Sequence, residues 1–304
     1  NTLRNWLKKG KTYLDELVCV LKSIALEKDS IVNCDETWCK VRKYDHYKKC
    51  YMWVLVNKAE RLVIFFYEDG SRGRDVLTNF LGDAELKALM SDGYNAYVFI
   101  GDELKTHRYK DTDHQVCLAH VRAKFVKARM EGGDKRADVF LGNINRLFRF
   151  EREYDREMIT DGERTRRRQG LPTMEAMINL RANLLQELKS EEEQKSCYMR
   201  EALNYLHKFW NEAFTYIKDG RYPISNNLAE RAVRPFTTKR KNSLHFGSDE
   251  GAEIAAVYHS IISTVKLQGR SAWDYLGKFF TGIFNGCRDF LSLTPQNIDL
   301  AVCQ

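Results

Sequence analysis

The 304-residue chain lacks several features that would assign it directly to a class of protein. It has no apolar run near the roughly 20 residues that a membrane-spanning helix needs, so we expect no membrane partner. It has no secretory leader, and its eight cysteines form no CxxC framework, so we expect reduced thiols in a cytoplasmic protein. It also lacks an initiator Met, and apolar residues recur at helical spacing from its first residues. We therefore expect that an upstream portion precedes residue 1.

Familiar catalytic motifs are also missing. The chain contains no GxSxG elbow, no Walker loop and no GxGxxG segment, so acyl transfer, nucleotide hydrolysis and dinucleotide chemistry have no basis in it. Lys and Arg number 49 against 42 for Asp and Glu, which gives a formal net charge of +7. This excess fits a polyanionic partner such as nucleic acid, although many other enzymes carry a similar one.

The regular elements begin with three strand-like runs. They lie at 31–43, 50–58 and 61–69, and the short bend between the last two predicts a hairpin. A short amphipathic helix at 74–83, an apolar run within 85–100 and a strand entering a helix at 112–130 follow. Three strands followed by alternating helices and strands indicate an α/β fold of the ribonuclease H-like (RNase H-like) type, a mixed β-sheet with flanking helices.

The composition changes after this region. From about 121 to 222 the chain is rich in Glu, Arg, Lys, Leu and Met at helical periods, which predicts a large all-helical insertion. Its one break, at 160–173, is interpreted as a basic loop whose Arg164–Arg168 cluster is either solvated or in contact with phosphate. Five parts are predicted: an N-terminal helix (1–30), a first part of the core (31–120), the insertion (121–222), a last part of the core (223–270) and a C-terminal helical element (271–304).

The segment that follows the insertion is punctuated by two prolines. Pro223 and Ser225 predict the start of a helix, and Pro235 predicts its end. A second, longer helix is expected from about Gly251 to Leu267.

Three carboxylates stand out by their context. Asp35 lies in the first strand beside Glu36, and the period-two alternation of a strand turns these two side chains to opposite faces. Asp92 lies at the tip of a later strand, and Glu230 lies within the helix after Pro223. Each also has a purely structural interpretation: a solvent-facing strand position for Asp35, a turn residue for Asp92, and an ion pair with Arg234 for Glu230.

Three convergent carboxylates would suit Mg²⁺ or Mn²⁺, since these ions prefer oxygen ligands together with water and phosphate. Two such ions about 3.5–4 Å apart can activate an attacking oxygen and stabilise a leaving one at phosphorus. The spacing of the three residues alone does not decide between this chemistry and the structural interpretations.

Seven short segments occur in a fixed order along the chain. They are DET (35–37), SDGYNAY (91–97), CLAHVRAKF (117–125), SNNLAERAVRP (225–235), RKN (240–242), FGSDEGAE (246–253) and HSIISTVKLQG (259–269). No single segment is specific, but together they resemble the transposases of the insertion sequence 66 (IS66) family, which are bacterial DDE transposases. The resemblance extends from about residue 31 to residue 304.

The resemblance implies an RNase H-like catalytic domain whose DDE triad is Asp35, Asp92 and Glu230, which would hold two Mg²⁺ or Mn²⁺ ions. It implies DNA cleavage at transposon ends and transfer of the freed 3′-hydroxyl into target DNA. Homo-oligomers in a synaptic complex, accessory transposition proteins and a location at the bacterial nucleoid are expected with this chemistry. Two rival functions are a nuclease that only hydrolyses DNA and a catalytically dead DNA-binding relic. The chain departs from many relatives at Asn33, where they have His.

Cys117 and His120 form a C-x-x-H pair after a predicted strand. The resemblance places them on a motif common to several DDE families, which implies that they support the catalytic core. A packed Cys and His is the second interpretation, and zinc is the third because no further pair lies at finger-like spacing.

Basic residues gather around Glu230. Asn227, Glu230, Arg231 and Arg234 share one helical face, which would suit a metal ligand beside DNA phosphates, with Asn227 in a supporting role. The alternative is a helix-capping Asn with ordinary ion pairs. Lys239, Arg240 and Lys241 extend the predicted DNA-binding surface. Packing roles are expected for the tryptophans Trp38, Trp53, Trp210 and Trp273.

Overall fold

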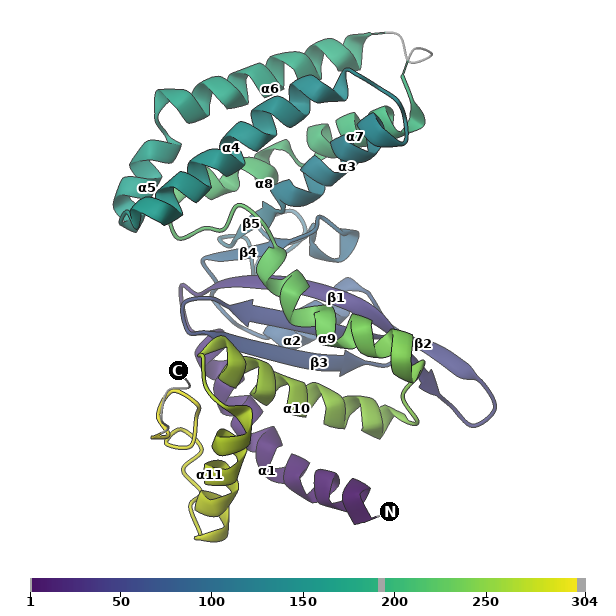
Figure 1. Cartoon of the computed structure of the whole chain (residues 1–304), viewed down its shortest axis with the longest axis vertical. Helices are drawn as coiled ribbons and strands as arrows, with labels where there is room; N and C mark the ends of the chain where they lie inside the picture. Colours follow the sequence, from purple (N-terminus) through teal and green to yellow (C-terminus); the bar gives the residue numbers. More distant parts are fainter. Residues whose placement is uncertain (1, 191–194, 300–304) are drawn as a thin grey trace. The chain divides into compact units, whose positions relative to one another are not determined.

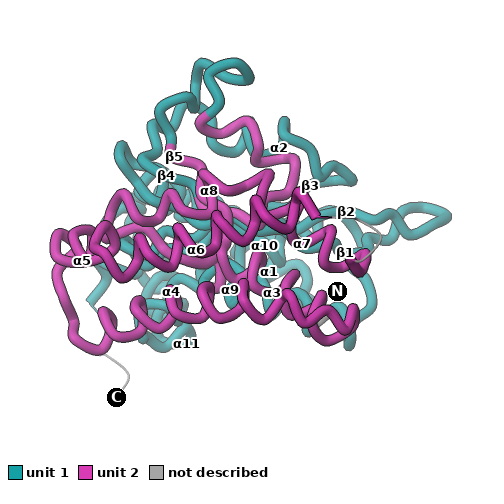
Figure 2. Tube along the Cα trace, turned by 90° about the horizontal axis from the view of Figure 1, so that it is seen from above, with its two compact units in different colours: residues 1–89, 102–112, 228–304 teal, residues 90–101, 113–227 magenta. Residues whose placement is uncertain are grey.

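The structure is a computed structural model that describes residues 2–190 and 195–299, with the side chain of Lys239 left out. The chain divides into two compact units (Figure 2). Unit 1 comprises residues 1–89, 102–112 and 228–304, and unit 2 comprises residues 90–101 and 113–227. Each unit is described separately below.

The strands form one five-stranded sheet in the order β3-β2-β1-β4-β5 (Figure 1). Their bounds are Ile31–Arg42 (β1), Tyr47–Asn57 (β2), Leu62–Glu68 (β3), Ala88–Ser91 (β4) and Asp113–Val116 (β5). β1 pairs antiparallel with β2, and β2 pairs antiparallel with β3. The predicted hairpin and the mixed α/β class are confirmed.

Helices cover both faces of the β1–β3 sheet in unit 1. They are α1 (Thr2–Ala25), α2 (Arg74–Leu81), α9 (Asn227–Ser243) and α10 (Asp249–Leu267), and α11 (Ala272–Phe284) packs against α10. On one face, Met52, Val54 and Phe65 of the strands join residues of α9 and α10 in a single buried cluster. On the other face, Trp53 stacks on Phe66, with ring centres 5.8 Å apart, and Phe66 stacks on Phe80 of α2 at 3.7 Å. This cover on both faces explains why β2 is a nearly continuous apolar run.

The edge strand β3 is protected by hydroxyl groups of α10. The backbone N–H of Phe65 donates to Ser260 Oγ at 2.8 Å, and that of Val63 donates to Thr264 Oγ1 at 3.0 Å. Both hydroxyls are fully buried. They satisfy backbone groups that an exposed edge strand would offer to another chain.

Unit 2 is mainly helical, as the periodicity of its sequence predicts. Its helices are α3 (Leu118–Met130), α4 (Ala137–Glu157), α5 (Asp161–Arg168), α6 (Leu171–Lys189), α7 (Cys197–Lys208) and α8 (Trp210–Phe214), followed by the 3₁₀-helix η3 (Thr215–Lys218). Phe125 of α3 stacks on Phe140 of α4 with ring centres 4.4 Å apart. Both rings are buried, so they join the first two helices of this unit.

The prediction of a basic loop at 160–173 is wrong, because residues 161–168 form α5. Thr160 caps this helix by accepting the N–H of Glu163. Acidic residues occupy the first turn and arginines the last, an arrangement that complements the helix dipole. The segment is polar but its charges are paired within the protein, which is why its composition resembled that of a loop.

Arg168, at the end of α5, is buried with 1% of its surface exposed, so neither predicted interpretation of the cluster applies to it. Its Nε and Nη2 donate to the carboxylate of Glu151 at 2.8 and 2.7 Å. Its remaining donors reach the backbone carbonyls of Tyr216, Asp219 and Tyr222. One guanidinium group therefore connects α4 and α5 to the segment 216–222.

Three further expectations need correction. Pro235 does not end its helix, since α9 continues through it to Ser243. Proline removes one helical hydrogen bond, but the neighbouring Val233 and Phe236 are buried in the unit 1 core and hold the helix in place.

The helix expected between β4 and β5 is only the short 3₁₀-helix η1 (Asn95–Tyr97). Trp273 is 84% exposed and does not pack in the core.

The β1–β2 hairpin is anchored to the rest of unit 1 by one lysine. Lys43 Nζ lies 2.9 Å from Asp69 Oδ1 and 2.6 Å from Asp249 Oδ1, and the Tyr67 hydroxyl donates to Asp249. The sulfur of Cys50 lies beside the same carboxylates, but the Lys43 ammonium group already supplies the positive charge between them. Hydrogen bonding to Lys43 lowers the pKa of Asp69 to about 2.

No helix within the described ranges is long and apolar enough to cross a membrane.

The Lys43 anchor predicts a specific loss of stability in acid. The folded-state pKa of Asp69 lies below its unfolded value of about 3.9, so its contribution is complete above about pH 4 and decreases as the pH falls towards 2. Replacing Asp69 with Asn should flatten the pH dependence of the unfolding free energy in this window. Urea unfolding of both proteins between pH 2 and pH 5 would measure it; parallel curves would contradict the assignment.

The buried position of Arg168 predicts that replacing this one residue lowers the free energy of unfolding strongly. Arg168→Met leaves the buried Glu151 with Arg164 as its remaining ion-pair partner and removes the donors to three backbone carbonyls, so it should lower the unfolding free energy by about 3–5 kcal/mol. The matched control is Arg166→Met in the same helix, whose side chain is 74% exposed and whose ion pair should contribute about 0–1 kcal/mol. Chemical denaturation would compare the two variants, and equal effects would refute the structural role of Arg168.

Candidate active site

Asp35 and Glu36 point to opposite faces of the sheet, as predicted. Asp35 lies opposite Val54 and Glu36 lies opposite Trp53 in the β1–β2 register. Directly opposed residues of antiparallel strands share a face. Val54 belongs to the cluster covered by α9, so Asp35 faces the α9 side of the sheet.

Glu36 has a structural partner on the other face. Its side chain is fully buried and forms an ion pair with Arg72, whose Nε donates to Glu36 Oε1 at 2.7 Å. A buried carboxylate held in this way stabilises the segment between β3 and α2. The structure thus gives Glu36 a role in holding the fold together.

Asp35 itself is half-buried in the middle of β1. Its Oδ1 accepts the backbone N–H of Glu36 at 2.9 Å, which restrains the orientation of the carboxylate. Asn33, two residues earlier on the same face, is buried. Asp35 is therefore the acidic residue that β1 presents to the face covered by α9.

Glu230 lies in the first turn of α9, next to the stripe by which this helix packs on the sheet. Ala229, Val233 and Phe236 form that stripe and are buried, whereas Glu230 is half-buried. The N-terminal end of a helix stabilises a nearby carboxylate through its dipole. Within unit 1, Asp35 therefore lies on a face of the sheet, and Glu230 lies on the helix that covers this face.

The predicted DNA-binding residues of α9 differ in their surroundings. Arg231, Arg234 and Lys241 are exposed, and the side chain of Lys239 lies outside the described part of the structure. Arg240 instead reaches β1, where its Nη1 donates to Thr37 Oγ1 at 3.0 Å and to the carbonyl oxygen of Trp38 at 2.9 Å. Its guanidinium carbon lies 4.0 Å from the centre of the Trp38 ring.

In unit 2, Asp92 follows β4 directly and organises the turn there. Its Oδ1 accepts the N–H of Tyr94 at 2.9 Å, so the predicted turn chemistry is present. Its backbone carbonyl accepts the hydroxyl of Tyr205 from α7. The residue is half-buried. Its position at the tip of a strand is as predicted.

Two residues that support this turn, His114 and Tyr205, were not predicted from the sequence. Ser91 Oγ lies 3.0 Å from Nε2 of His114 and accepts the N–H of Gly93 at 3.3 Å. Burial lowers the pKa of His114 to about 4, so this imidazole is neutral at physiological pH. Burial also raises the pKa of Tyr205, with a further contribution from Asp92. Tyr205 is 113 residues from Asp92, so no local sequence signal could have identified it.

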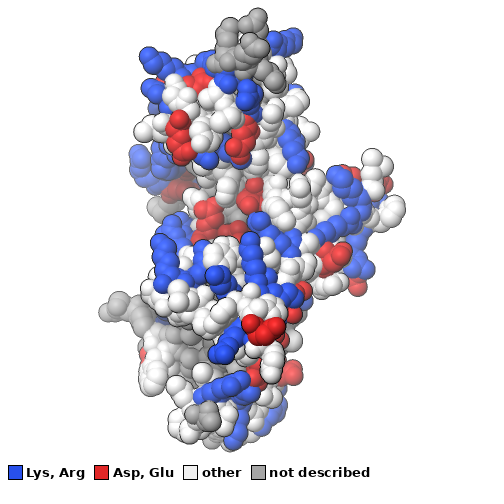
Figure 3. Space-filling view, turned by 90° about the vertical axis from the view of Figure 1, so that its right-hand side faces the viewer, with Lys and Arg blue, Asp and Glu red and all other residues white. Residues whose placement is uncertain are grey.

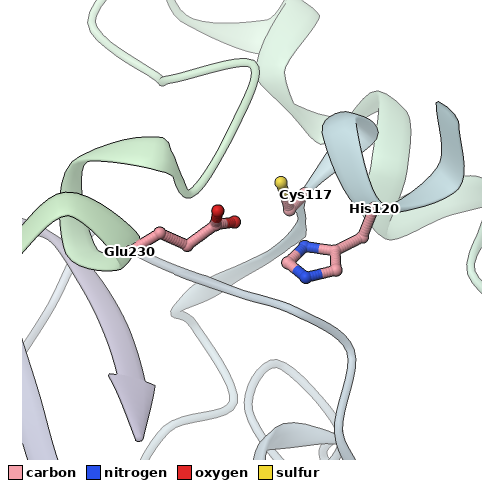
Figure 4. Close-up of side chains that lie close together, drawn as sticks. All are labelled: Cys117, His120 and Glu230. Carbon is pink, nitrogen blue, oxygen red and sulfur yellow. The ribbon is translucent and has the colours of Figure 1, made fainter. Parts of the chain in front are cut away.

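Cys117 and His120 lie where β5 runs into α3, and Glu230 lies on α9 (Figure 4). The backbone N–H of Cys117 donates to the carbonyl of Ser91 at 2.9 Å, and its sulfur accepts the N–H of Asn226 at 3.1 Å. Cys117 Sγ and a ring nitrogen of His120 lie within 4.8 Å of each other. Cys117 therefore joins the end of β4 to the segment that precedes α9.

Two adjacent asparagines lie where α9 begins. Asn227 was predicted to support the catalytic core, but Asn226 is the buried one. Asn226 is fully buried, whereas Asn227 is exposed at the start of α9. Asn226 directly precedes α9 and Asn227 begins it, and sequence alone does not show which of two adjacent asparagines turns inwards.

Comparisons with known proteins find a matching family model and several relatives. A family model described as "Transposase IS66 family" matches residues 1–254. Two uncharacterized proteins of Sinorhizobium fredii (strain NBRC 101917 / NGR234) are similar over most of the chain. The protein y4jD is 29% identical over 253 residues, which are 79% of this chain and 47% of that protein. The protein y4qI is 27% identical over 239 residues, with 78% and 43% covered. The chain thus spans less than half the length of these relatives.

The opposite faces of Asp35 and Glu36 predict opposite consequences of substitution. Glu36→Ala removes the partner of Arg72 from a buried ion pair and should lower the unfolding free energy by about 3 kcal/mol. Asp35→Asn retains an oxygen for the N–H of Glu36 and should change stability by less than about 1 kcal/mol. Urea unfolding would compare the two variants, and a larger loss in Asp35→Asn would contradict the assigned faces.

Proposed function

The chain belongs to the IS66 transposase family, and we propose that it is the catalytic region of a DDE transposase with an RNase H-like fold. In this proposal it cleaves DNA at transposon ends and joins the freed 3′ ends to target DNA. One observation carries the proposal. Asp35 lies on the sheet face that α9 covers, and Glu230, 195 residues further along the chain, lies on α9.

The RNase H-like fold is supported by the order of the strands. Three antiparallel strands, β3, β2 and β1, continue into β4 and β5 in the sheet. Helix α2 separates the first three strands from β4 along the chain. Strands β1 and β4 are neighbours in this order; the first carries Asp35, and Asp92 follows the second.

The proposed triad is Asp35, Asp92 and Glu230. All three are carboxylates, and each is half-buried, so each combines a fixed environment with access for a ligand. This donor set fits Mg²⁺ or Mn²⁺, which prefer oxygen ligands, and we propose that the three residues would hold two such ions. When bound, the ions would polarise the attacking oxygen and neutralise charge on the leaving oxygen.

Both proposed steps are displacements at phosphorus. In cleavage, the oxygen of water forms a bond to phosphorus while the bond to the 3′ oxygen breaks, which leaves a 3′-hydroxyl and a 5′-phosphate. In joining, that 3′-hydroxyl attacks a target phosphodiester, and the target's own 3′ oxygen leaves and takes up a proton. One phosphodiester bond forms for each one broken in this second step, so joining requires no ATP.

Other residues would act on the triad or on the DNA. Cys117, with its hydrogen bonds to Ser91 and Asn226, would hold the residue before Asp92 and the segment before α9, and His120 would support this junction. Arg231 and Arg234, both exposed on α9, would contact phosphates of the DNA, as would Lys239 and Lys241.

The proposed partners are the transposon ends and the target DNA. Joining two ends requires at least two active sites, so we propose a homo-oligomer in a synaptic complex, which can also involve accessory transposition proteins.

A nuclease that only hydrolyses DNA would keep the same triad, and a relic would keep only DNA binding. Both are distinguished from a transposase by one assay with the full-length protein, Mg²⁺ or Mn²⁺ and duplexes that carry the transposon's terminal sequences. Joined product supports the transposase, hydrolysis without joining supports the nuclease, and binding without reaction supports the relic.

The same assay tests the triad. Loss of a partner behind a metal ligand already costs about 10–100-fold in activity, so Asp35→Asn, Asp92→Asn and Glu230→Gln should each lower cleavage and joining more than about 100-fold. DNA binding and thermal stability should stay close to those of the unmodified protein. The matched control is Glu27→Gln, an exposed carboxylate of unit 1 just after α1. If Glu230→Gln retained activity, the third ligand would instead be sought at Glu253 or Glu212.

A further inference from the structure

A second surface lies on the opposite face of the β1–β2 ribbon from Asp35. Trp38 lies opposite Tyr51, Lys40 opposite Lys49, and Arg42 opposite Tyr47. The alternation of the strand places these side chains on the Glu36 face, at the hairpin end of the ribbon. Trp38, Lys40, Tyr47 and Lys49 line a cavity of about 400 Å³ there. We call these four residues the hairpin platform.

The aromatic rings of the hairpin platform are accessible and yet held in place. Trp38 is 37% exposed and Tyr47 is 55% exposed, although both are large apolar groups. The Arg240 guanidinium group lies against the Trp38 ring, and the His245 ring meets the Tyr47 ring edge-on with centres 4.7 Å apart. These contacts fix the rings before any ligand arrives, which lowers the entropic cost of binding to them.

The platform also carries an unfavourable pair of charges. Lys40 and Lys49 are both exposed and lie directly opposite each other on neighbouring strands, and like charges in this position destabilise a sheet. Among the residues that the structure describes, neither ammonium group forms an ion pair, and no carboxylate lines the cavity. An anion between the two lysines would turn this repulsion into attraction.

The wider surface carries both signs of charge. Figure 3 shows Lys and Arg side chains gathered across the middle of the face that includes the right-hand side of Figure 1, with groups of Asp and Glu above and below them. Arg42 is exposed on the platform's own face of the ribbon. A polyanion would therefore be attracted to this part of the ribbon, and its phosphates could continue beyond the cavity.

We propose that the hairpin platform binds an unpaired nucleotide of DNA, with its base stacked on the aromatic rings and its phosphate between Lys40 and Lys49. The inference rests on the proposed function only in taking DNA as the partner. Flat aromatic groups beside cations are the combination by which proteins hold single strands, since every base offers a π-face. The cavity lies in the range of about 300–1,000 Å³ that is usual for sites of small ligands. A base within a duplex is already stacked on its neighbours, which favours an unpaired one.

Arg240 links this surface to the proposed active site. It extends from α9, the helix that carries Glu230, donates to Thr37 on the Asp35 face and lies against Trp38 on the platform face. Arg240 would therefore position the Trp38 ring beside the DNA that the sequence predicts it to bind. A strand held on the platform would be fixed relative to the helix of the third proposed ligand.

The test compares single-stranded and duplex oligonucleotides of one sequence, bound by the full chain and followed by fluorescence anisotropy. Trp38→Leu should weaken single-strand binding about 5- to 150-fold, which corresponds to the ~1–3 kcal/mol of one stacked base, while duplex binding changes less than twofold. Trp38→Phe should restore most of the affinity because it keeps an aromatic face. The matched control is Trp273→Leu, an exposed tryptophan on α11 that should have no effect.

A second variant tests the phosphate site without altering a ring. Lys40→Gln with Lys49→Gln changes only exposed groups and should reduce the salt dependence of single-strand binding, by about 0.7 in log–log slope for each phosphate that the variant no longer neutralises. Equal losses of affinity for single strands and duplexes in both variants would overturn the proposal. So would weaker binding of poly-glutamate together with unchanged DNA binding, which would indicate a site for an acidic protein.

These outcomes separate the platform from the proposed chemistry. If the unmodified protein binds single strands through Trp38 but never joins DNA, the proposed function is wrong and the proposal for the hairpin platform is supported. If the protein joins DNA while Trp38→Leu binds single strands normally, the proposal for the hairpin platform is wrong and the proposed function is supported. Asp35→Asn should bind single strands like the unmodified protein, since Asp35 lies on the other face of the ribbon.

Discussion

The register between β1 and β2 is the constraint on which the rest of unit 1 depends. A slip of one residue would turn Asp35 to the face of Arg72 and Glu36 into the cluster under α9. Both faces resist this slip, because Val54 packs under α9 on one side and Trp53 joins an aromatic stack on the other. The burial of apolar residues thus fixes which carboxylate the sheet presents on the side of α9.

Helix α9 covers the sheet face to which this register turns Asp35. Its apolar stripe binds it to the sheet, and a Pro inside it removes a helical hydrogen bond at a cost of about 3 kcal/mol. Burial of Val233 and Phe236 on either side of Pro235 offsets that cost. The missing N–H lies beyond the turn of Glu230, so the N-terminal turn keeps its geometry while the later turns carry Arg240 to β1.

Sequence reasoning succeeded where the determining interaction is local. Alternation along β1 separated Asp35 from Glu36, and the end of the apolar run placed Asp92 at a strand tip. It failed where the partner is distant. The polar segment around Arg168 resembles a solvated loop until Glu151 and the carbonyls of residues 216–222 surround it. Tyr205 likewise meets the Asp92 carbonyl only through the packing of unit 2.

The β1–β2 ribbon also shows why one alternating pattern can serve two purposes. Near the hairpin, one face is closed by Phe246 and Ala252, while the other retains Trp38 and Tyr47 in contact with solvent. Burial explains the first face, but the second keeps exposed rings and two opposed lysines that folding alone does not favour. Features that cost stability and yet are rigidly held are more readily explained by a ligand than by the fold. The two faces of one ribbon would then serve the two proposed tasks, the reaction at phosphorus on the Asp35 side and the binding of a single strand on the other.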